Sequence, residues 1–375
     1  MPNYIKADQF FYPHGVRRGG YLELVDGKFG KHVEQIPEGA EVIDYTGYSI
    51  APGLVDTHIH GFGGVDVMDN NIEGTLHTMS EGLLSTGVTS FLPTTLTSSY
   101  EQLLAVTENI GARYREASGA KIRGIYFEGP YFTEKYKGAQ NPAYMKDPRM
   151  DEFRAWQKAA NGLLNKIALA PEREGVEDFV RTITGEGVTV AIGHSNATFD
   201  EAKKAVDAGA SVWVHAYNGM RGLTHRELGM VGAMYELPHT YAELICDGHH
   251  VDPKACDILL KQKGTENIAL ITDCMTAGGL EDGDYMLGEF PVVVVNGTAR
   301  LKSTGNLAGS ILKLKDGLKN VVEWGIANPH EAVMMASLNP AKSVHIDDVC
   351  GQIREGYDAD FIVLDKDLEL VATYL

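Results

Sequence analysis

Two histidines separated by one residue, His58 and His60, follow the apolar run Ile50–Val55 and precede a glycine-rich stretch. Side chains two positions apart on a strand point to the same face, so both imidazoles would point the same way at the end of a buried strand. Neutral imidazole is the commonest protein ligand for transition metals. An isolated pair of this kind is more often one core histidine and one turn histidine, so a metal site requires further ligands elsewhere in the chain.

Other side chains that can bind a metal or transfer a proton follow later apolar runs. They are Glu128, His194, His215 and Asp273. Taken singly, each has an ordinary structural explanation: a turn cap for Glu128, a hydrogen-bonded core position for His215, a helix cap for Asp273. Together with the first two histidines, however, all of them stand directly after a strand-like run. This coincidence favours one shared site.

The elements that would position these residues alternate along the middle of the chain. The strand-like runs are Ile50–Val55, Ser90–Pro93, Ile122–Phe127, Ile167–Ala170, Val188–Ile192, Val212–Val214, Tyr241–Ile245 and Ile268–Ile271. The helix-like segments are Glu73–Ser85, Tyr100–Ala117, Asp151–Leu163, Val176–Ile183, Phe199–Ala208, Pro253–Lys261 and Leu312–Trp324. Strands alternating with helices are typical of parallel βαβ units, and eight strands close a (β/α)8 barrel. A doubly wound open sheet is the alternative, but no Gly-rich dinucleotide fingerprint follows the first strand.

In a barrel of this type the C-terminal ends of the strands converge on the active site. The four histidines, Glu128 and Asp273 would then line one cleft. Imidazole and carboxylate ligands suit zinc or iron. Such an ion brings the pKa of a bound water towards neutrality, and hydrolysis also needs a group that takes the water proton and passes it to the leaving group. Asp273, at the end of the last strand, is the candidate for that group.

The two ends of the chain have a different pattern, with short strands broken by turn residues, as in Tyr21–Val25 followed by Asp26-Gly27. We therefore expect an α/β protein of three segments. Residues 49–344 would form a TIM-like (β/α)8 barrel, and residues 1–48 and 345–375 would together form a small β-sandwich domain.

Composition limits the classes of partner. Of the 375 residues 44% are hydrophobic and 22% charged, as in soluble globular proteins. The formal charge of −18 has no basic cluster against it, which argues against a nucleic-acid surface. No apolar run approaches the roughly 20 residues of a membrane span, and no signal-peptide pattern is visible. Reduced thiols in a cytoplasmic protein are expected from the wide spacing of Cys246, Cys256, Cys274 and Cys350.

Several stretches together resemble one family over essentially the whole chain. They are Gly53-Leu54-Val55-Asp56-Thr57-His58-Ile59-His60-Gly61, Phe127-Glu128-Gly129-Pro130, Gly193-His194-Ser195, His215-Ala216-Tyr217-Asn218-Gly219-Met220, Asp247-Gly248-His249-His250-Val251, Thr272-Asp273 and Leu307-Ala308-Gly309-Ser310. The chain resembles the amidohydrolase superfamily and, within it, the N-acetylglucosamine-6-phosphate deacetylases. This resemblance implies metal-dependent hydrolysis of the acetamide of N-acetyl-D-glucosamine 6-phosphate to glucosamine 6-phosphate and acetate, in amino-sugar catabolism.

The resemblance also assigns roles to the metal-site residues. Glu128, His194 and His215 would hold the principal divalent ion, zinc or iron. His58 and His60 would complete a second site with Glu128 bridging, so one or two ions per subunit are possible. Asp273 would contact the metal site and act as the general acid and base.

Substrate contacts are implied for a further set: Ala139, Gln140, Asn218, Gly219, Arg226, His250, Leu307, Ala308 and Gly309. Arg226 and His250 would meet the 6-phosphate, although Arg226 could instead be a surface charge at a helix start, paired with Glu227. Family members can receive phosphate contacts from a neighbouring subunit, which implies a homodimer. Gln140 stands where many relatives carry a histidine, so it could offer the amide carbonyl only a neutral hydrogen bond.

Two other functions remain possible on sequence grounds. One is a different amidohydrolase, such as a D-amino-acid deacylase or a cyclic-amide hydrolase. The other is a non-catalytic sugar-phosphate-binding barrel, which the complete set of candidate ligands disfavours. The segment from Tyr131 to Pro148 follows the third strand and is either a loop that shields the substrate or a plain surface loop.

Overall fold

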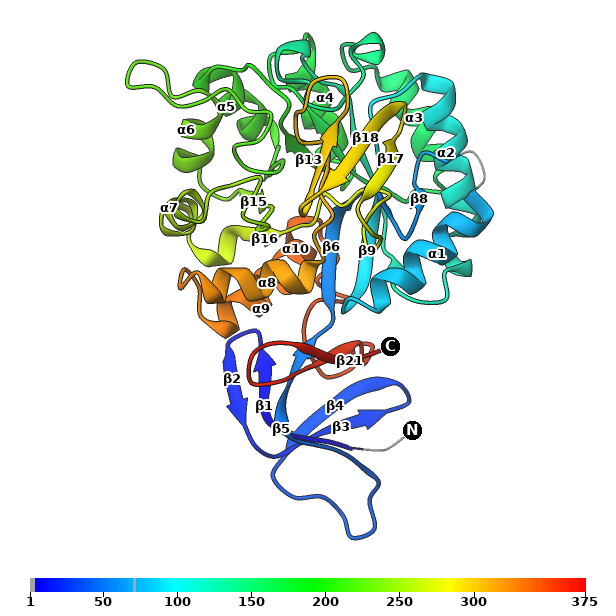
Figure 1. Ribbon diagram of the computed structural model, residues 1–375, viewed down its shortest axis with the longest axis vertical. Helices are drawn as coiled ribbons and strands as arrows, with labels where there is room; N and C mark the ends of the chain where they lie inside the picture. Colours follow the sequence, from blue (N-terminus) through cyan, green and yellow to red (C-terminus); the bar gives the residue numbers. More distant parts are fainter. Residues whose placement is uncertain (1–3, 70–71) are drawn as a thin grey trace.

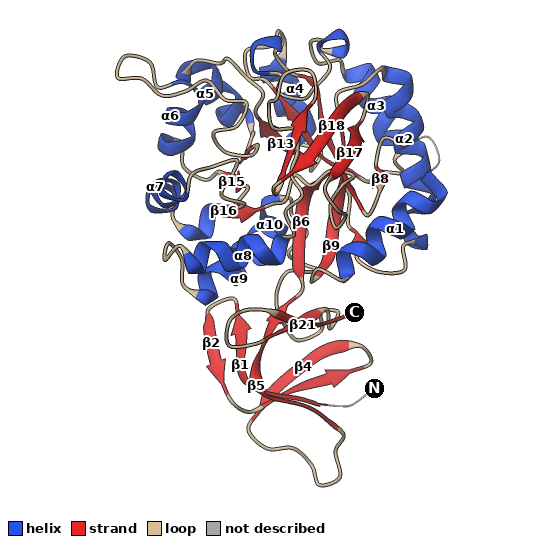
Figure 2. Ribbon diagram, in the orientation of Figure 1, coloured by secondary structure: helices blue, strands red, loops and turns tan. Residues whose placement is uncertain are grey.

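The computed structural model describes residues 4–69 and 72–375. Its larger part is a parallel barrel surrounded by helices (Figure 1, Figure 2). Neighbouring strands pair in chain order, as the alternating pattern predicts: β6 (Leu54–Ile59), β9 (Val88–Thr95), β11 (Ile125–Tyr131), β12 (Leu164–Leu169), β13 (Thr189–Ile192), β14 (Val212–Trp213), β15 (Tyr241–Leu244) and β16 (Ile268–Leu270). A short strand, β10 (Lys121–Ile122), pairs with β9 ahead of β11.

The barrel closes between its last and first strands. Beyond β16 the chain forms a parallel bridge from Cys274 to Ile59, and the backbone N–H of Asp273 donates to the carbonyl of His58 at 2.9 Å. The expected (β/α)8 class is therefore confirmed, and the open-sheet alternative is wrong. Closure also brings residues 58 and 273 side by side, although more than half of the chain separates them.

Alternation along the strands divides the core into two layers. Tyr126, Ala168 and Ala191 belong to one buried cluster, while their chain neighbours Phe127, Ile167 and Val190 belong to another, which packs under the helices. Both faces of each strand are thus buried, which is why these runs are almost continuously apolar. A polar side chain on the inner face of such a strand is therefore conspicuous.

The outer layer contains the helices expected from sequence, with small differences at their ends: α1 (Ile72–Leu84), α2 (Tyr100–Arg113), α3 (Met150–Ala159), α4 (Val176–Thr184), α5 (Phe199–Ala208), α7 (Pro253–Lys263) and α8 (Leu314–Glu323). Helix α5 has clear signals, because Thr198 and Glu201 form a capping box and Gly209 ends it. Three further helices were not expected: α6 (Gly229–Glu236), α9 (Pro329–Ala336) and α10 (Leu338–Ser343). No helix in the described part of the chain has the length and apolar character of a membrane span.

Both ends of the chain contribute to one separate sheet, as the sequence predicts. Its strands are β1 (Tyr4–Tyr12), β2 (Gly15–Arg18), β3 (Tyr21–Val25), β4 (Lys28–Val33), β5 (Val42–Pro52), β20 (Phe361–Leu364) and β21 (Leu370–Tyr374). The sheet has its own core, with Phe10, Phe29 and Phe361, and lies at the end of the barrel where β5 leads into β6 (Figure 1). The predicted domain limit at residue 48 falls within β5, which continues to Pro52. The domain limits at residues 48 and 344 stay a prediction.

A three-stranded antiparallel insertion follows the eighth barrel strand and was not expected. It comprises β17 (Gly283–Leu287), β18 (Phe290–Val295) and β19 (Thr298–Leu301). Its sequence signal is the pair Asn296-Gly297 between two β-rich runs, since both residues adopt positive φ angles in this turn. A smaller hairpin, β7 (Gly61–Phe62) with β8 (Val65–Asp66), follows the first strand. The insertion packs Leu287 and Val292 against Leu96 and Met275 at the barrel mouth.

Candidate metal centre and active site

The predicted metal-site residues fall into two groups at the C-terminal ends of the strands. His58, His60 and Asp273 form one group, and Glu128, His194 and His215 form the other; within each group the candidate ligand atoms all lie within 4.8 Å of one another. All six residues are buried. Side chains from five different strands therefore meet at one end of the barrel.

Glu128 lies between the two groups. Its Oε1 atom is 3.2 Å from Nε2 of both His194 and His215, and its Oε2 atom is 3.2 Å from Nε2 of His60. Asp273 Oδ1 lies 3.1 Å from His60 Nε2. A carboxylate in the position of Glu128 can contribute one oxygen to each of two cation sites.

The hydrogen bonds of the rings determine which nitrogen faces the centre. Nδ1 lies 3.1 Å from the Thr94 carbonyl in His60, 2.8 Å from the Tyr136 carbonyl in His194 and 3.1 Å from the Asn218 carbonyl in His215. A carbonyl oxygen can only accept, so each Nδ1 carries a proton, and whenever the ring is neutral its Nε2 has a lone pair free for a metal. In His58 the partner of Nδ1 is instead the Glu243 carboxylate, at 3.0 Å.

The residues present fit a bound divalent transition metal. The buried Nε2 of His58 has no hydrogen-bond partner among the described residues, although the other ring nitrogen, Nδ1, is paired with Glu243. Four inward-facing imidazole nitrogens with carboxylate oxygens are a donor set for zinc or iron. No thiolate competes, because all four cysteines lie outside both groups.

Electrostatics at this end of the barrel favour a cation. Burial would lower the pKa of His58, but Glu243, Glu128 and Asp273 outweigh it and raise the pKa to about 9. Burial likewise opposes a charged His60, yet the hydrogen bonds that its ring donates to Asp273 and Glu128 raise its pKa well above the usual value. Burial would raise the pKa of Glu128, whereas His58 and the other imidazoles hold it well below the ordinary range. Positive charge, from protons or metal, stabilises this set of ligands.

The local backbone conformation orients three of these side chains. His194, His215 and Asp273 have φ angles of 43°, 26° and 50°, in the left-handed region that non-glycine residues seldom adopt. Each lies two or three residues beyond the end of its strand, so the turn directs the side chain across the barrel mouth. Strain of this kind concentrates at functional sites, where the surrounding structure holds it.

A cavity of about 140 Å³ opens beside the ligands, and most of the predicted substrate contacts line it. These are Ala139, Gln140, Asn218, Gly219, His250, Leu307 and Gly309; Leu96 and Leu287 add apolar wall that the sequence did not predict. Ala308 is instead buried in the core of the antiparallel insertion, where its N–H donates to the Ala299 carbonyl. The segment predicted as a shielding loop contributes Gly138 to Gln140 to the cavity wall; whether it moves over substrate stays a prediction.

Arg226 lies outside this cavity. It is exposed, in the segment between Met220 and α6 that protrudes from the barrel mouth in Figure 1. The alternative of a helix-start ion pair with Glu227 is not what the structure contains, because Glu227 accepts from the backbone N–H groups of Phe199 and Gly229 and α6 begins at Gly229. Arg226 is thus not one of the residues that line the cavity of its own subunit.

Gln140 is held by protein groups. Its Nε2 donates to the Glu128 carboxylate, and its Oε1 accepts from the N–H of Thr97 at 2.7 Å. The amide therefore orients the carboxylate that lies between the two ligand groups. The neutral hydrogen bond to a substrate carbonyl suggested by the sequence would require this amide to change partner.

His250 also lines the cavity and is paired with an aspartate. Its Nδ1 lies 2.6 Å from Asp247 Oδ2, and the other Asp247 oxygen accepts from the N–H groups of His249 and His250 at 2.8 Å each. Burial would lower the pKa of His250, but the bond to Asp247 prevails and raises it. A protonated imidazole here can attract an anion.

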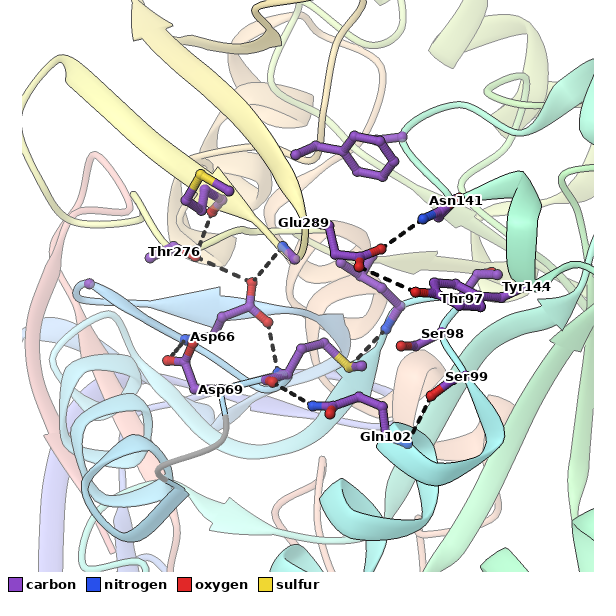
Figure 3. Close-up of a pocket in the computed structure, with 17 residues that line it drawn as sticks. Asp66, Asp69, Thr97, Ser98, Ser99, Gln102, Asn141, Tyr144, Thr276 and Glu289 are labelled. Atoms are coloured by element: carbon purple, nitrogen blue, oxygen red, sulfur yellow. Dashed lines mark hydrogen bonds between the residues drawn. The ribbon is translucent and has the colours of Figure 1, made fainter.

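A larger chamber of about 540 Å³ adjoins the first cavity, sharing Leu96 and Ala139 with it (Figure 3). Its carboxylates, Asp66, Asp69 and Glu289, are engaged by protein donors: Glu289, for example, accepts from Asn141 at 2.7 Å and from Tyr144 at 3.3 Å. No Lys, Arg or His is among the described residues that line it. The chamber is therefore a poor place for a phosphate.

Sequence reasoning missed two buried charges beneath the ligands, Glu243 on β15 and Lys166 on β12. Both are completely buried and form an ion pair inside the barrel. The available signal was a charged residue at an inward-facing position of a strand that is otherwise apolar, as in Tyr241-Ala242-Glu243-Leu244.

Comparisons with known proteins extend over nearly the whole chain. The model of the amidohydrolase family matches residues 49–374. N-acetylglucosamine-6-phosphate deacetylase of Vibrio furnissii is 39% identical over 355 residues, which cover 94% of this chain and 86% of that protein. N-acetylgalactosamine-6-phosphate deacetylase of Escherichia coli O157:H7 is 38% identical over 371 residues, covering 99% and 97%. A mutant N-acetyl-D-glucosamine-6-phosphate deacetylase from Mycobacterium smegmatis, solved with N-acetyl-D-glucosamine 6-phosphate, superimposes with a TM-score of 0.94 at 30% identity, covering 100% and 97%.

Proposed function

This chain belongs to the amidohydrolase family, and we propose that it deacetylates N-acetyl-D-glucosamine 6-phosphate, giving glucosamine 6-phosphate and acetate in amino-sugar catabolism. The observation that carries the proposal is the meeting of four Nε2 lone pairs with Glu128 and Asp273 beside a cavity that also contains the His250–Asp247 pair. The first feature suits amide hydrolysis and the second suits a phosphate. Relatives with this activity share the architecture over almost their full length.

Glu128, His194 and His215 would hold the principal ion, and His58 and His60 a second one, with Glu128 between them and Asp273 on the side of His60. One or two zinc or iron ions, when bound, would lower the pKa of a water and polarise the amide carbonyl. The three-residue groups of the two sites support this division.

Asp273 would move the proton. Its Oδ1 faces the ligand group, and its charged neighbours His58 and His60 outweigh burial and lower its pKa, so it is an ionised base at neutral pH. The water oxygen adds to the carbonyl carbon while the Asp273 carboxylate takes the water proton. The same carboxyl then gives the proton to the amine nitrogen as the C–N bond breaks, which leaves acetate and the free amino sugar.

His250, with Asn218 and Gly219, would receive the 6-phosphate in the smaller cavity, which these three residues line. The exposed position of Arg226 supports a second contribution: in a homodimer, Arg226 of the neighbouring subunit would reach this phosphate. Ala139, Gln140 and the segment Leu307 to Gly309 would contact the sugar and its acetamide. A phosphorylated substrate and four buried free thiols fit a cytoplasmic enzyme.

The C4 configuration of the sugar is the open point of specificity, because relatives named for N-acetylglucosamine and for N-acetylgalactosamine 6-phosphates are about equally similar to this chain. A panel of both phosphorylated sugars, unphosphorylated N-acetylglucosamine and N-acetyl amino acids, compared by kcat/KM, tests the proposal. We expect the N-acetylglucosamine 6-phosphate value to exceed that of the unphosphorylated sugar by roughly 100-fold, as for a lost charge-assisted contact. Preference for N-acetyl amino acids would instead identify another amidohydrolase.

A further inference from the structure

A buried chain of charged groups runs beneath the candidate metal centre. Lys166 Nζ pairs with Glu243 Oε1 and lies 3.8 Å from the centroid of the Tyr126 ring. The other oxygen of Glu243 is 3.0 Å from His58 Nδ1 and accepts from the backbone N–H of His215 at 3.2 Å. Among the four candidate imidazole ligands, only His58 is thus oriented by an ionised side chain rather than by a backbone carbonyl.

The position of the pair argues against a role in stability alone. Lys166, Glu243 and His58 all have 0% exposed surface. Removing two charges from water costs several kcal/mol per ion, and apolar residues of similar volume are often as stabilising or more so. Apolar residues would fit at these inward-facing positions. Ala168, two residues after Lys166 on the same face of β12, is apolar and belongs to the inner core. A buried ion pair at this place therefore needs another explanation.

The contacts of Glu243 supply such an explanation. A histidine binds a metal through Nε2 only when Nδ1 carries the proton, and a carboxylate at Nδ1 fixes that tautomer and makes Nε2 a better donor. Lys166 pairs with Oε1 of Glu243, the carboxylate oxygen that does not face His58, so both oxygens of this fully buried side chain have partners. Glu243 Oε2 also accepts from the backbone N–H of His215, but the ring of His215 has its own acceptor, the Asn218 carbonyl.

We propose that Glu243, with Lys166 as its counter-ion, is a positioning residue that loads the His58–His60 site with its metal ion and so determines whether the enzyme holds one ion or two. The inference rests on the metal centre of the proposed function but not on its substrate. The proposal predicts that replacing Glu243 weakens binding of the second ion only, because the rings of His60, His194 and His215 keep their own backbone acceptors.

The test compares metal binding with folding. Wild type, Glu243→Gln and the double variant Lys166→Met/Glu243→Leu are dialysed against zinc buffered over a range of free concentrations, and bound zinc per subunit is measured together with thermal unfolding. Thr189→Val is the matched control, since Thr189 Oγ1 is buried without a partner on a neighbouring barrel strand. We expect wild type and control to take up two ions, and both Glu243 variants to need roughly 10–100-fold more free zinc for the second ion only.

The double variant separates positioning from structure, because it leaves no unpaired charge. It should unfold near the wild-type temperature and still load the second ion poorly. Wild-type uptake of both ions by the double variant would overturn the inference, and so would a wild type that never binds more than one ion. Acetate release by the same preparations is scored separately: a one-ion wild type that deacetylates the substrate would leave the proposed function intact.

Discussion

The Nε2 atoms of His194 and His215 lie 3.0 Å apart, although both rings direct their Nδ1–H groups to backbone carbonyls. When both rings are neutral, two lone pairs therefore face each other across this contact, with no proton between them. Glu128 Oε1, 3.2 Å from each nitrogen, adds a third negative atom to the same point. A cation at this point removes the repulsion among all three, so the arrangement is that of a ligand set.

The first prediction concerns the distance between β13 and β14, the strands that precede His194 and His215. A Cβ at residue 193 would lie 2.6 Å from Cβ of Val214, so Gly193→Ala must push β13 and β14 apart. We expect a loss of about 1–3 kcal/mol in stability and weaker binding of the principal ion, measured by thermal unfolding and zinc titration. Val214→Gly in the same chain removes the Cβ that causes the clash and should restore part of the metal affinity. A Gly193→Ala single variant with wild-type metal affinity would contradict the geometry.

The second prediction isolates proton transfer. Asp273→Asn keeps the shape of the side chain but removes the base, so kcat should fall by roughly 10²–10⁴-fold while bound metal and unfolding temperature stay close to wild type. Metal analysis of the assayed sample is the control. Turnover near that of wild type would remove Asp273 from this role.

The third prediction tests the phosphate contact across subunits. Arg226→Ala should raise KM for the phosphorylated sugar by roughly 10–100-fold and leave unphosphorylated N-acetylglucosamine unaffected, because one charge-assisted contact is lost. Arg18→Ala, which removes an exposed arginine from the terminal sheet, is the matched control. Equal effects on both sugars would argue against phosphate recognition, and a monomer in solution would argue against the subunit exchange.

The fourth prediction is a pH dependence. Asp247 raises the pKa of His250 against the effect of burial, so the imidazolium persists to higher pH than a free histidine. As the pH rises through that raised pKa the cation is lost, and KM for the phosphorylated sugar should increase. In Asp247→Asn burial dominates, so the increase should begin at lower pH. An unchanged KM profile in this variant would dissociate His250 from phosphate binding, with the unphosphorylated sugar as the reference.

The sequence predicted the strands and the convergence of their ends better than it predicted the insertions. Residues such as His194 and Asp273 stand directly after apolar runs, and barrel topology then brings them together. The antiparallel insertion was missed because its signal, Asn296-Gly297, is local and follows the point where the alternating pattern ends. Glu243 and Lys166 were missed because a single charge in a strand reveals its partner only when the barrel is closed. For Arg226 the sequence indicates a phosphate contact but does not show in which subunit that contact would be made.

Acetate release from N-acetyl-D-glucosamine 6-phosphate by protein of known metal content is the most direct test of the central claim, that these converging side chains bind the ion on which amide hydrolysis depends. The account predicts activity in proportion to bound metal, loss on chelation, and recovery when zinc or iron is returned. Full activity in metal-free protein, or metal-loaded protein that releases no acetate, would contradict it.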